Sequence, residues 1–362
     1  MKSKSKKMKR YYFTVLLLLP LSIIAQKIVD LDRYNFTVQF RSLPQMRLDS
    51  TYRTYNVTVE GTKLMQSFLQ EINPTASVIL EGWKKLSDKG HLLIEIKLED
   101  LLPETVSVKE RVEVTKDKNG VITSTKTFYF QEVVYTFAAF AKISDYKGQH
   151  IQDIVLANRT TKQVFKSPEF PVKEVAEGYF LINALKTTNE LYRSSVNNAM
   201  RLLSNEISNN FGFGTVTVKD YMWVIDSRKH PQYAAHREAF LKMNEYLFNL
   251  NANIPLTGLK EKLQPVIDYF ELVKKTYNTT SKHDRKIKYA SYFNLAVIYY
   301  YLDDPQSMMK EANGLKLNDF DSKMGTSFQE SALRLKTLFE SSNIYSRHFS
   351  IDINSFKGPF EK

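Results

Sequence analysis

The sequence contains no cysteine among its 362 residues. A chain without cysteine forms no disulfides, iron–sulfur clusters or thiolate zinc sites, and it lacks the acylated cysteine that anchors a bacterial lipoprotein. Tryptophan is scarce, with two residues, whereas the chain has 21 tyrosines and 23 phenylalanines. Most of these aromatic residues recur at strand or helix periodicity, so we expect them to pack in hydrophobic cores.

Long hydrophobic runs are also missing, with one short exception near the start of the chain. Tyr11 to Ala25 is apolar, is interrupted by Pro20, and follows a cluster of five lysines and one arginine. This layout predicts a signal peptide over residues 1–25, with the mature chain beginning near Gln26. We therefore expect export to the periplasm or the medium, without a lipid anchor and with membrane contact only before cleavage. A retained N-terminal anchor is the alternative.

The net charge of +12 first suggests a nucleic-acid-binding protein. Six of the 51 basic residues, however, lie in the first ten positions, so the rest of the chain has 45 basic against 39 acidic residues. No basic run remains there to follow a phosphate backbone. We expect no nucleic-acid partner.

Residues 26–230 predict an α+β domain with a mostly antiparallel sheet and packed helices. Apolar residues alternate over Leu92 to Leu98, which is typical of a half-buried strand. Asn119 and Gly120 predict the turn of a hairpin that projects beyond the sheet. Val133 to Ile143 is apolar on both faces and predicts one central strand, with a further strand near Ser77 to Lys84.

Helical periodicity predicts one helix among these strands, over residues 62–72. Two more helices are predicted after them, over residues 172–185 and 188–208, and a strand follows at residues 215–225. Residues 231–345 form a second predicted domain that is helical throughout. Pro265 predicts a break or kink there, because proline is best tolerated in the first turn of a helix. A helix over Thr326 to Ser342 would cap this domain, and residues 346–362 form a C-terminal tail with a possible strand at His348 to Ile353.

The segment from Tyr289 to Leu317 contains the most specific pattern in the chain. Within it, Tyr292, Leu295, Ala296 and Tyr299 have the spacing of a first repeat helix, and Pro305 can begin a second helix capped by Asp304. The segment resembles a tetratricopeptide repeat, a helical pair of about 34 residues. Met308 departs from that pattern, since the repeat normally has alanine there to let its helices approach closely.

The resemblance implies protein binding, so the sequence favours an exported adaptor or scaffold with a protein or peptide partner in the cell envelope. First-helix residues usually line the groove of such repeats. The candidate partner-binding residues are Lys288, Tyr292, Asn294 and Tyr299.

The alternative function is a secreted hydrolase or carbohydrate-binding protein with a site in an interdomain cleft. Four residues of different chemistry gather at the predicted domain boundary: Trp223, Asp226, Arg228 and His230. The chain has no nucleophile-elbow, zincin or P-loop pattern. Its pairs of aspartates close together in the sequence lie in predicted turns, where aspartate usually satisfies backbone groups. We expect no cofactor, no metal and no catalytic residues, although catalytic groups can converge from distant positions.

Overall fold

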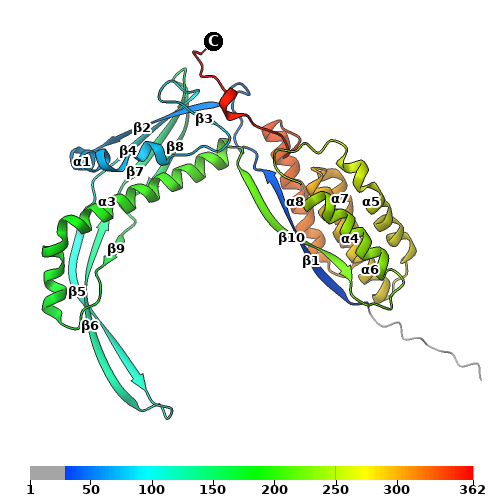
Figure 1. Cartoon of the computed structure of the whole chain (residues 1–362), viewed down its shortest axis with the longest axis horizontal. Coiled ribbons are helices and arrows are strands. Elements are labelled where there is room, and N and C mark those ends of the chain that lie inside the picture. Colours follow the sequence, from blue (N-terminus) through cyan, green and yellow to red (C-terminus); the bar gives the residue numbers. More distant parts are fainter. Residues whose placement is uncertain (1–28, 249, 362) are drawn as a thin grey trace, which may run out of the picture.

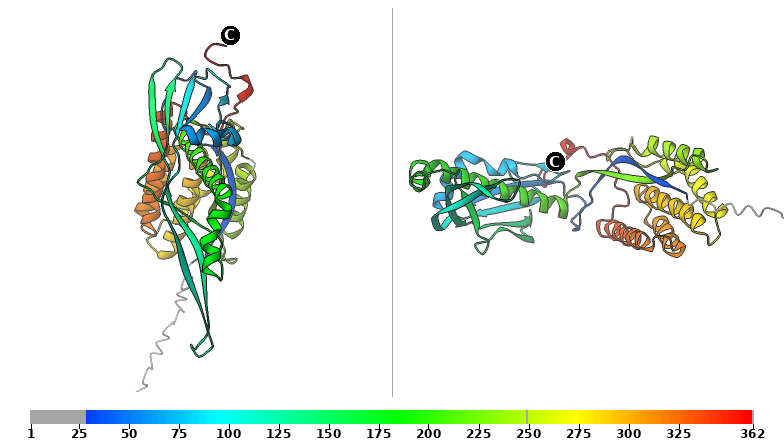
Figure 2. Two further views of the ribbon diagram at one scale, coloured as in Figure 1. Left: turned by 90° about the vertical axis from the view of Figure 1, so that its left-hand side faces the viewer. Right: turned by 90° about the horizontal axis from the view of Figure 1, so that it is seen from below.

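The structure is a computed structural model, and it describes residues 29–248 and 250–361. The predicted signal peptide lies outside the described residues. The fold is α+β, as predicted, and the molecule is a bent, elongated arc with two halves joined at its centre (Figure 1). The view from below in Figure 2 shows the two halves side by side along the long axis.

The first half, which we call the sheet half, is built on a five-stranded sheet. Its strand order is β3-β2-β4-β7-β8, in which β2 lies parallel to β3 and β4 and the other pairs are antiparallel. The strands are β2 (Thr54–Gly61), β3 (Lys84–Lys85), β4 (Leu92–Leu98), β7 (Ala139–Asp145) and β8 (His150–Ala157). Three helices pack on it: α1 (Lys63–Ile72), α2 (Pro74–Ser77) and α3 (Lys173–Phe211).

A long hairpin extends from the sheet half, as the sequence predicts (Figure 1). It consists of β5 (Leu102–Lys116) and β6 (Ile122–Thr136), and β9 (Gln163–Lys166) pairs with the base of β6. The connection between the two strands is formed by residues 117–121, which include the predicted turn residues Asn119 and Gly120. Gly120 has a φ of 81°, and Asp117 accepts hydrogen bonds from the backbone of Asn119 and Val121. One carboxylate therefore holds this loop together.

The second half, which we call the helical half, contains five helices and one two-stranded ribbon. The helices are α4 (Tyr233–Phe248), α5 (Leu259–Thr276), α6 (Lys282–Tyr301), α7 (Pro305–Asn318) and α8 (Ser322–Ser342). The ribbon pairs β1 (Leu31–Arg41) with β10 (Thr215–Ile225), antiparallel along their whole length. It packs against α4 and α6.

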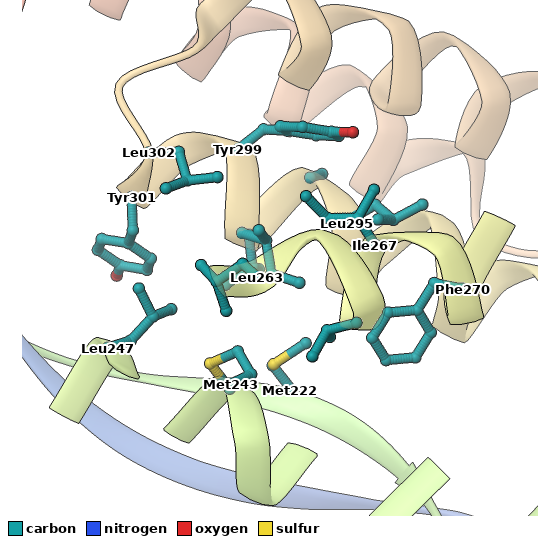
Figure 3. Close-up of a cluster of buried hydrophobic side chains, with 14 of the residues drawn as sticks. Met222, Met243, Leu247, Leu263, Ile267, Phe270, Leu295, Tyr299, Tyr301 and Leu302 are labelled. Carbon is teal, nitrogen blue, oxygen red and sulfur yellow. The ribbon is translucent and has the colours of Figure 1, made fainter. Parts of the chain in front are cut away.

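Each half has its own hydrophobic core. The core of the helical half places apolar side chains of β1 and β10, such as Phe36 and Met222, against α4 to α7. Figure 3 shows Met222 and Met243 facing Leu263 of α5 in this core. The core of the sheet half also takes in Leu335 and Phe339 from α8. The last helix therefore contributes to both halves.

The repeat-like pair forms as the sequence predicts, with α6 and α7 joined by a short turn. Asp304 caps α7 by accepting a hydrogen bond from the backbone of Ser307 (2.9 Å), and Pro305 occupies the first turn. Met308 is buried despite its departure from the repeat pattern. The two helices approach each other closely at a different position, where the Tyr292 ring of α6 packs on Gly314 of α7. A Cβ at Gly314 would lie 2.2 Å from that ring. A glycine is required where that ring crosses α7.

Several predicted elements are wrong. Residues 133–143 belong to two sheets, because β6 ends at Thr136 and β7 begins at Ala139. The predicted strand at 77–84 is replaced by the end of α2, a turn and the start of β3, and no strand forms at 348–353, where a 3-10 turn covers Ile353–Ser355. The two helices predicted over 172–208 are one 39-residue helix. Pro265 lies inside α5 without ending it.

The predicted domain boundary at residue 230 does not coincide with the division of the hydrophobic core. β1 and β10 precede that residue but belong to the helical half. The C-terminal tail joins the halves, because Lys84 of β3 donates from Nζ to the carbonyl of Phe356 (2.7 Å), and Phe349 donates its backbone N–H to the carbonyl of Ala252 (3.0 Å). The continuous segment 42–214, inserted between two strands of the helical half, therefore carries the sheets of the sheet half, and α8 and the tail add side chains to its core.

Candidate functional site

The four residues of the predicted interdomain cleft make contacts with different neighbours: Trp223, Asp226, Arg228 and His230. Trp223 packs edge-on against Phe293. Asp226 is exposed and pairs with Arg237 (3.4 Å), while His230 faces the ring of His283 at 5.4 Å between centroids. No hydrogen bond, ion pair or ring contact joins any two of the four in the described structure.

Two of the predicted partner-binding residues on α6, Asn294 and Tyr299, are buried inside the protein. Asn294 is 1% exposed, and its side chain accepts from the backbone N–H of Trp223 (2.9 Å) and donates to the carbonyl of the same residue (2.8 Å). Tyr299 is buried in the core (Figure 3), where burial raises its pKa to about 12. Asn294 thus holds the ribbon of β1 and β10 on α6, whereas Tyr299 lies on the side of α6 that faces α5 and α7.

The other two predicted partner residues, Tyr292 and Lys288, are partly exposed. The ring of Tyr292 packs under the Lys274 ammonium, 4.7 Å from Nζ, and against Gly314 of α7. Burial raises the pKa of Tyr292, and the nearby carboxylate of Glu311 adds to that effect. Tyr292 is thus a packing residue between α5 and α7. The predicted groove along the first repeat helix is filled by the protein itself.

An open groove lies instead between the start of α7 and one side of α8. It has a volume of about 830 Å³. Its lining residues on α8 recur at spacings of three and four, which places them on one side of the helix: Ala332, Leu333, Lys336, Phe339 and Glu340. Tyr345, which follows α8, and Leu302 and Met309 from the α6–α7 region complete the lining.

The floor of the groove is apolar and fixed, while part of its wall is apolar and exposed. Leu302, Ala332 and Phe339 form a buried floor. Leu333 is 57% exposed and Tyr345 is 65% exposed. Exposed apolar side chains above a buried apolar floor are the usual composition of a surface that a partner covers.

One end of the groove is held by a buried ion pair. Nε of Arg347 lies 2.6 Å from Oδ1 of Asp303, and both side chains are at most 3% exposed. The backbone N–H of Arg347 donates to the second carboxylate oxygen, and its guanidinium lies over the rings of Phe40 and Tyr300. Because Asp303 is in the α6–α7 turn, this pair fixes the segment after α8 against the start of α7.

The rim of the groove carries charges of both signs. Lys260 reaches Oδ2 of Asp304 (3.1 Å), and Lys336 lies near Glu340 (3.7 Å). Burial alone would raise the pKa of Asp304, but hydrogen bonds from Ser307 and the Lys260 ammonium outweigh it and lower the pKa. The carboxylate therefore stays ionised at neutral pH. The groove combines apolar contacts with a charged edge.

The described residues support neither a metal site nor a membrane helix. Among residues 29–248 and 250–361, no cluster of three or more histidine or acidic side chains is placed to bind a metal ion. Within the same ranges, every helix is too short or too polar to span a bilayer.

Comparison with known proteins gives little further information. No family model and no curated protein matches the chain. Among solved structures, the chain is similar to a crystal structure of a candidate neuraminyllactose-binding hemagglutinin homolog from Helicobacter pylori. The identity is 12% and the TM-score 0.24, covering 46% of this chain and 89% of that one. A TM-score this low supports no functional inference, so the function rests on the groove itself.

Sequence reasoning missed the groove because its residues come from three separate segments. One signal was present. Leu333 and Leu335 cannot share one face of a helix, since they are two residues apart. The structure buries Leu335 in the core of the sheet half and leaves Leu333 exposed above the groove. Apolar residues on more than one face of the capping helix thus marked a second contact surface.

Proposed function

We propose that this protein is a non-enzymatic binding protein of the cell envelope or external medium, acting as an adaptor or scaffold. The observation that carries the proposal is the groove between α7 and α8, with its buried apolar floor and the exposed Leu333 and Tyr345. Burying a leucine or an aromatic side chain contributes about 1.5–3 kcal/mol. Covering these two residues would supply a substantial part of the free energy of a specific complex.

The partner that fits this groove best is an amphipathic helix of another protein. A helix presents apolar side chains every three or four residues to such a groove and keeps its polar side chains at the edge. The rim offers Lys260 and Lys336 as well as Asp304 and Glu340. Both signs of charge on the rim favour a partner helix that also carries both signs.

Export is part of the proposal and is supported by the sequence pattern of residues 1–25. N-terminal sequencing of the native protein tests this part directly. A chain beginning near Gln26 agrees with export and cleavage. A chain that retains Met1 to Ala25 would instead indicate an anchor.

Photo-crosslinking in the full chain tests the groove. A photoreactive amino acid at Leu333 should give a discrete adduct with one partner in cells of the source organism. Leu317 is the matched control, because it is an apolar residue on α7, is 86% exposed and does not line the groove. The same label at Leu317 should not give that adduct.

Met309→Glu places a carboxylate in the groove wall and should abolish the adduct at residue 333 while the circular dichroism spectrum stays unchanged. Equal adducts from Leu333 and Leu317 would indicate unspecific contact of exposed leucines. That result, or an adduct that survives Met309→Glu, would contradict the proposed function.

A further inference from the structure

Two adjoining cavities lie where the halves meet, away from the groove. The larger has a volume of about 530 Å³ and the smaller about 330 Å³, and both are lined by Arg53, Phe213 and Ile344. Trp83 and Phe211 add aromatic surface to the larger one. A volume of 300–1,000 Å³ is the usual size of a small-molecule site. The lining of the larger cavity combines this aromatic surface with polar and charged residues, among them Arg53 and Asn343.

Arg53 stands between the two cavities without a carboxylate partner. Its Nη1 donates to the carbonyl of Tyr52 (2.7 Å), and its guanidinium lies 5.3 Å from the centre of the Phe213 ring. Burial lowers the pKa of Arg53. Within the described structure no neighbouring carboxylate offsets this burial, although a guanidinium has five N–H donors. A partly buried cation with unused donors beside a cavity favours an anionic ligand.

The neighbouring charges leave the larger cavity positive. Arg47 is exposed at its rim. Asp49 is also on the rim as an ionised carboxylate, whose Oδ1 accepts from the backbone and hydroxyl of Thr51 (2.9 and 2.8 Å). With Arg47 and Arg53 against Asp49, the charged lining residues sum to +1. Behind Phe213 lies Arg41, which is 6% exposed and hydrogen-bonds to the carbonyls of Phe213 and Phe349 and to the side chain of Asn253.

The smaller cavity has one acidic residue in its wall, Asp352. Its Oδ1 accepts the backbone N–H of Asn354 (3.1 Å), which commits it to the 3-10 turn. The side of Arg53 that faces the larger cavity is therefore the side available to an anion.

We propose that the larger cavity binds an organic carboxylate with an apolar body, whose two oxygens accept parallel hydrogen bonds from Arg53. Arginine matches a carboxylate in this two-point geometry better than lysine does. The apolar body lies against Trp83 and Phe213. A free organic acid and the C-terminal carboxylate of a peptide share this chemistry.

Trp83 provides the measurement. Its Nε1 donates to the carbonyl of Phe211 (2.8 Å) in the cavity wall. The only other tryptophan is Trp223 in the helical half, so the Trp223→Phe chain reports fluorescence from Trp83 alone. This full-length variant is titrated with 3-phenylpropionate, with acetyl-phenylalanine, and with the uncharged 3-phenylpropionamide.

We expect saturable fluorescence changes with one or both carboxylates and none with the amide. A response to acetyl-phenylalanine but not to 3-phenylpropionate identifies the peptide C-terminus as the natural source, and the reverse identifies a free acid. Arg53→Met should weaken binding by at least about tenfold, because it removes charge-assisted hydrogen bonds. Arg228→Met changes an exposed arginine elsewhere and should leave binding unchanged.

Arg53→Lys keeps the charge but loses the two-point geometry, so it should also weaken binding. It replaces Arg53→Met in the test if that variant does not fold. Equal responses to the acid and the amide would overturn the proposal. So would the absence of any response to both carboxylates, or full binding in both Arg53 variants.

Discussion

His236 provides a test of the packing in the helical half through pH. Its side chain is 0% exposed, and neither ring nitrogen has a hydrogen-bond partner in the described structure. It packs edge-on against Phe270 and Tyr269 of α5, at 5.3 and 6.0 Å between ring centroids. Burial, with a smaller contribution from the charge of His230, lowers the pKa of His236 from 6.5 to about 3.

The sign of the effect follows from comparing the two states. The unfolded chain takes up a proton at His236 near pH 6.5, whereas the folded chain does so only near pH 3. Folding therefore becomes less favourable as pH falls between these values. Below pH 6.5, each pH unit lowers the free energy of unfolding by about 1.36 kcal/mol. Moving from pH 8 to pH 5 should therefore cost about 2 kcal/mol through this one residue, since only the part below pH 6.5 counts.

The assay compares the wild-type chain with His236→Phe, because other buried histidines, such as His91 and His348, also have lowered pKa values. Urea unfolding at pH 8 and pH 5 is followed by tryptophan fluorescence, to which Trp223 of the same half contributes. The loss of stability on acidification should be smaller in the variant by about 2 kcal/mol. His150→Gln is the control, since His150 is more than half exposed. Equal losses in wild type and His236→Phe would refute the reasoning.

Two further substitutions test the contacts that join the segments of the helical half. Asn294→Ala should lower the free energy of unfolding by about 2 kcal/mol, because it leaves the backbone N–H and carbonyl of Trp223 without their partner. Urea unfolding measures this loss, and a loss below about 0.5 kcal/mol would contradict the assigned role. Arg347→Met should cost about 3–5 kcal/mol by stranding the buried carboxylate of Asp303. Adding Asp303→Asn should restore part of that loss in the same assay, and no recovery would show that the charge is not the cause.

Local patterns predicted the elements whose stability depends on near neighbours. The alternation over Leu92 to Leu98 identified β4, and Asp304 with Pro305 identified the start of α7. Both signals act within a few residues, because strand alternation and helix capping are local effects. The repeat-like pair was recognisable for the same reason.

Elements that depend on distant partners could not be read in this way. Val133 to Ile143 is apolar throughout, but the chain changes sheets between Thr136 and Ala139, which only the pairing of β7 with β4 reveals. The helical half was assigned too few residues, because the pairing of Leu31 with Ile225 links positions that are far apart in the sequence. The groove was missed because its lining comes from three separate segments that only the tertiary fold brings together.

The β1–β10 ribbon makes the helical half a discontinuous domain, and this has a consequence for its evolution and for engineering. Arg41 and Thr215 are register partners at the same end of the ribbon. A short loop between them would close a hairpin and bypass residues 42–214 entirely. The chain can therefore be regarded as a helical protein that received a whole second unit inside one turn, while a cut after β10 would separate the five helices from the strands that complete them.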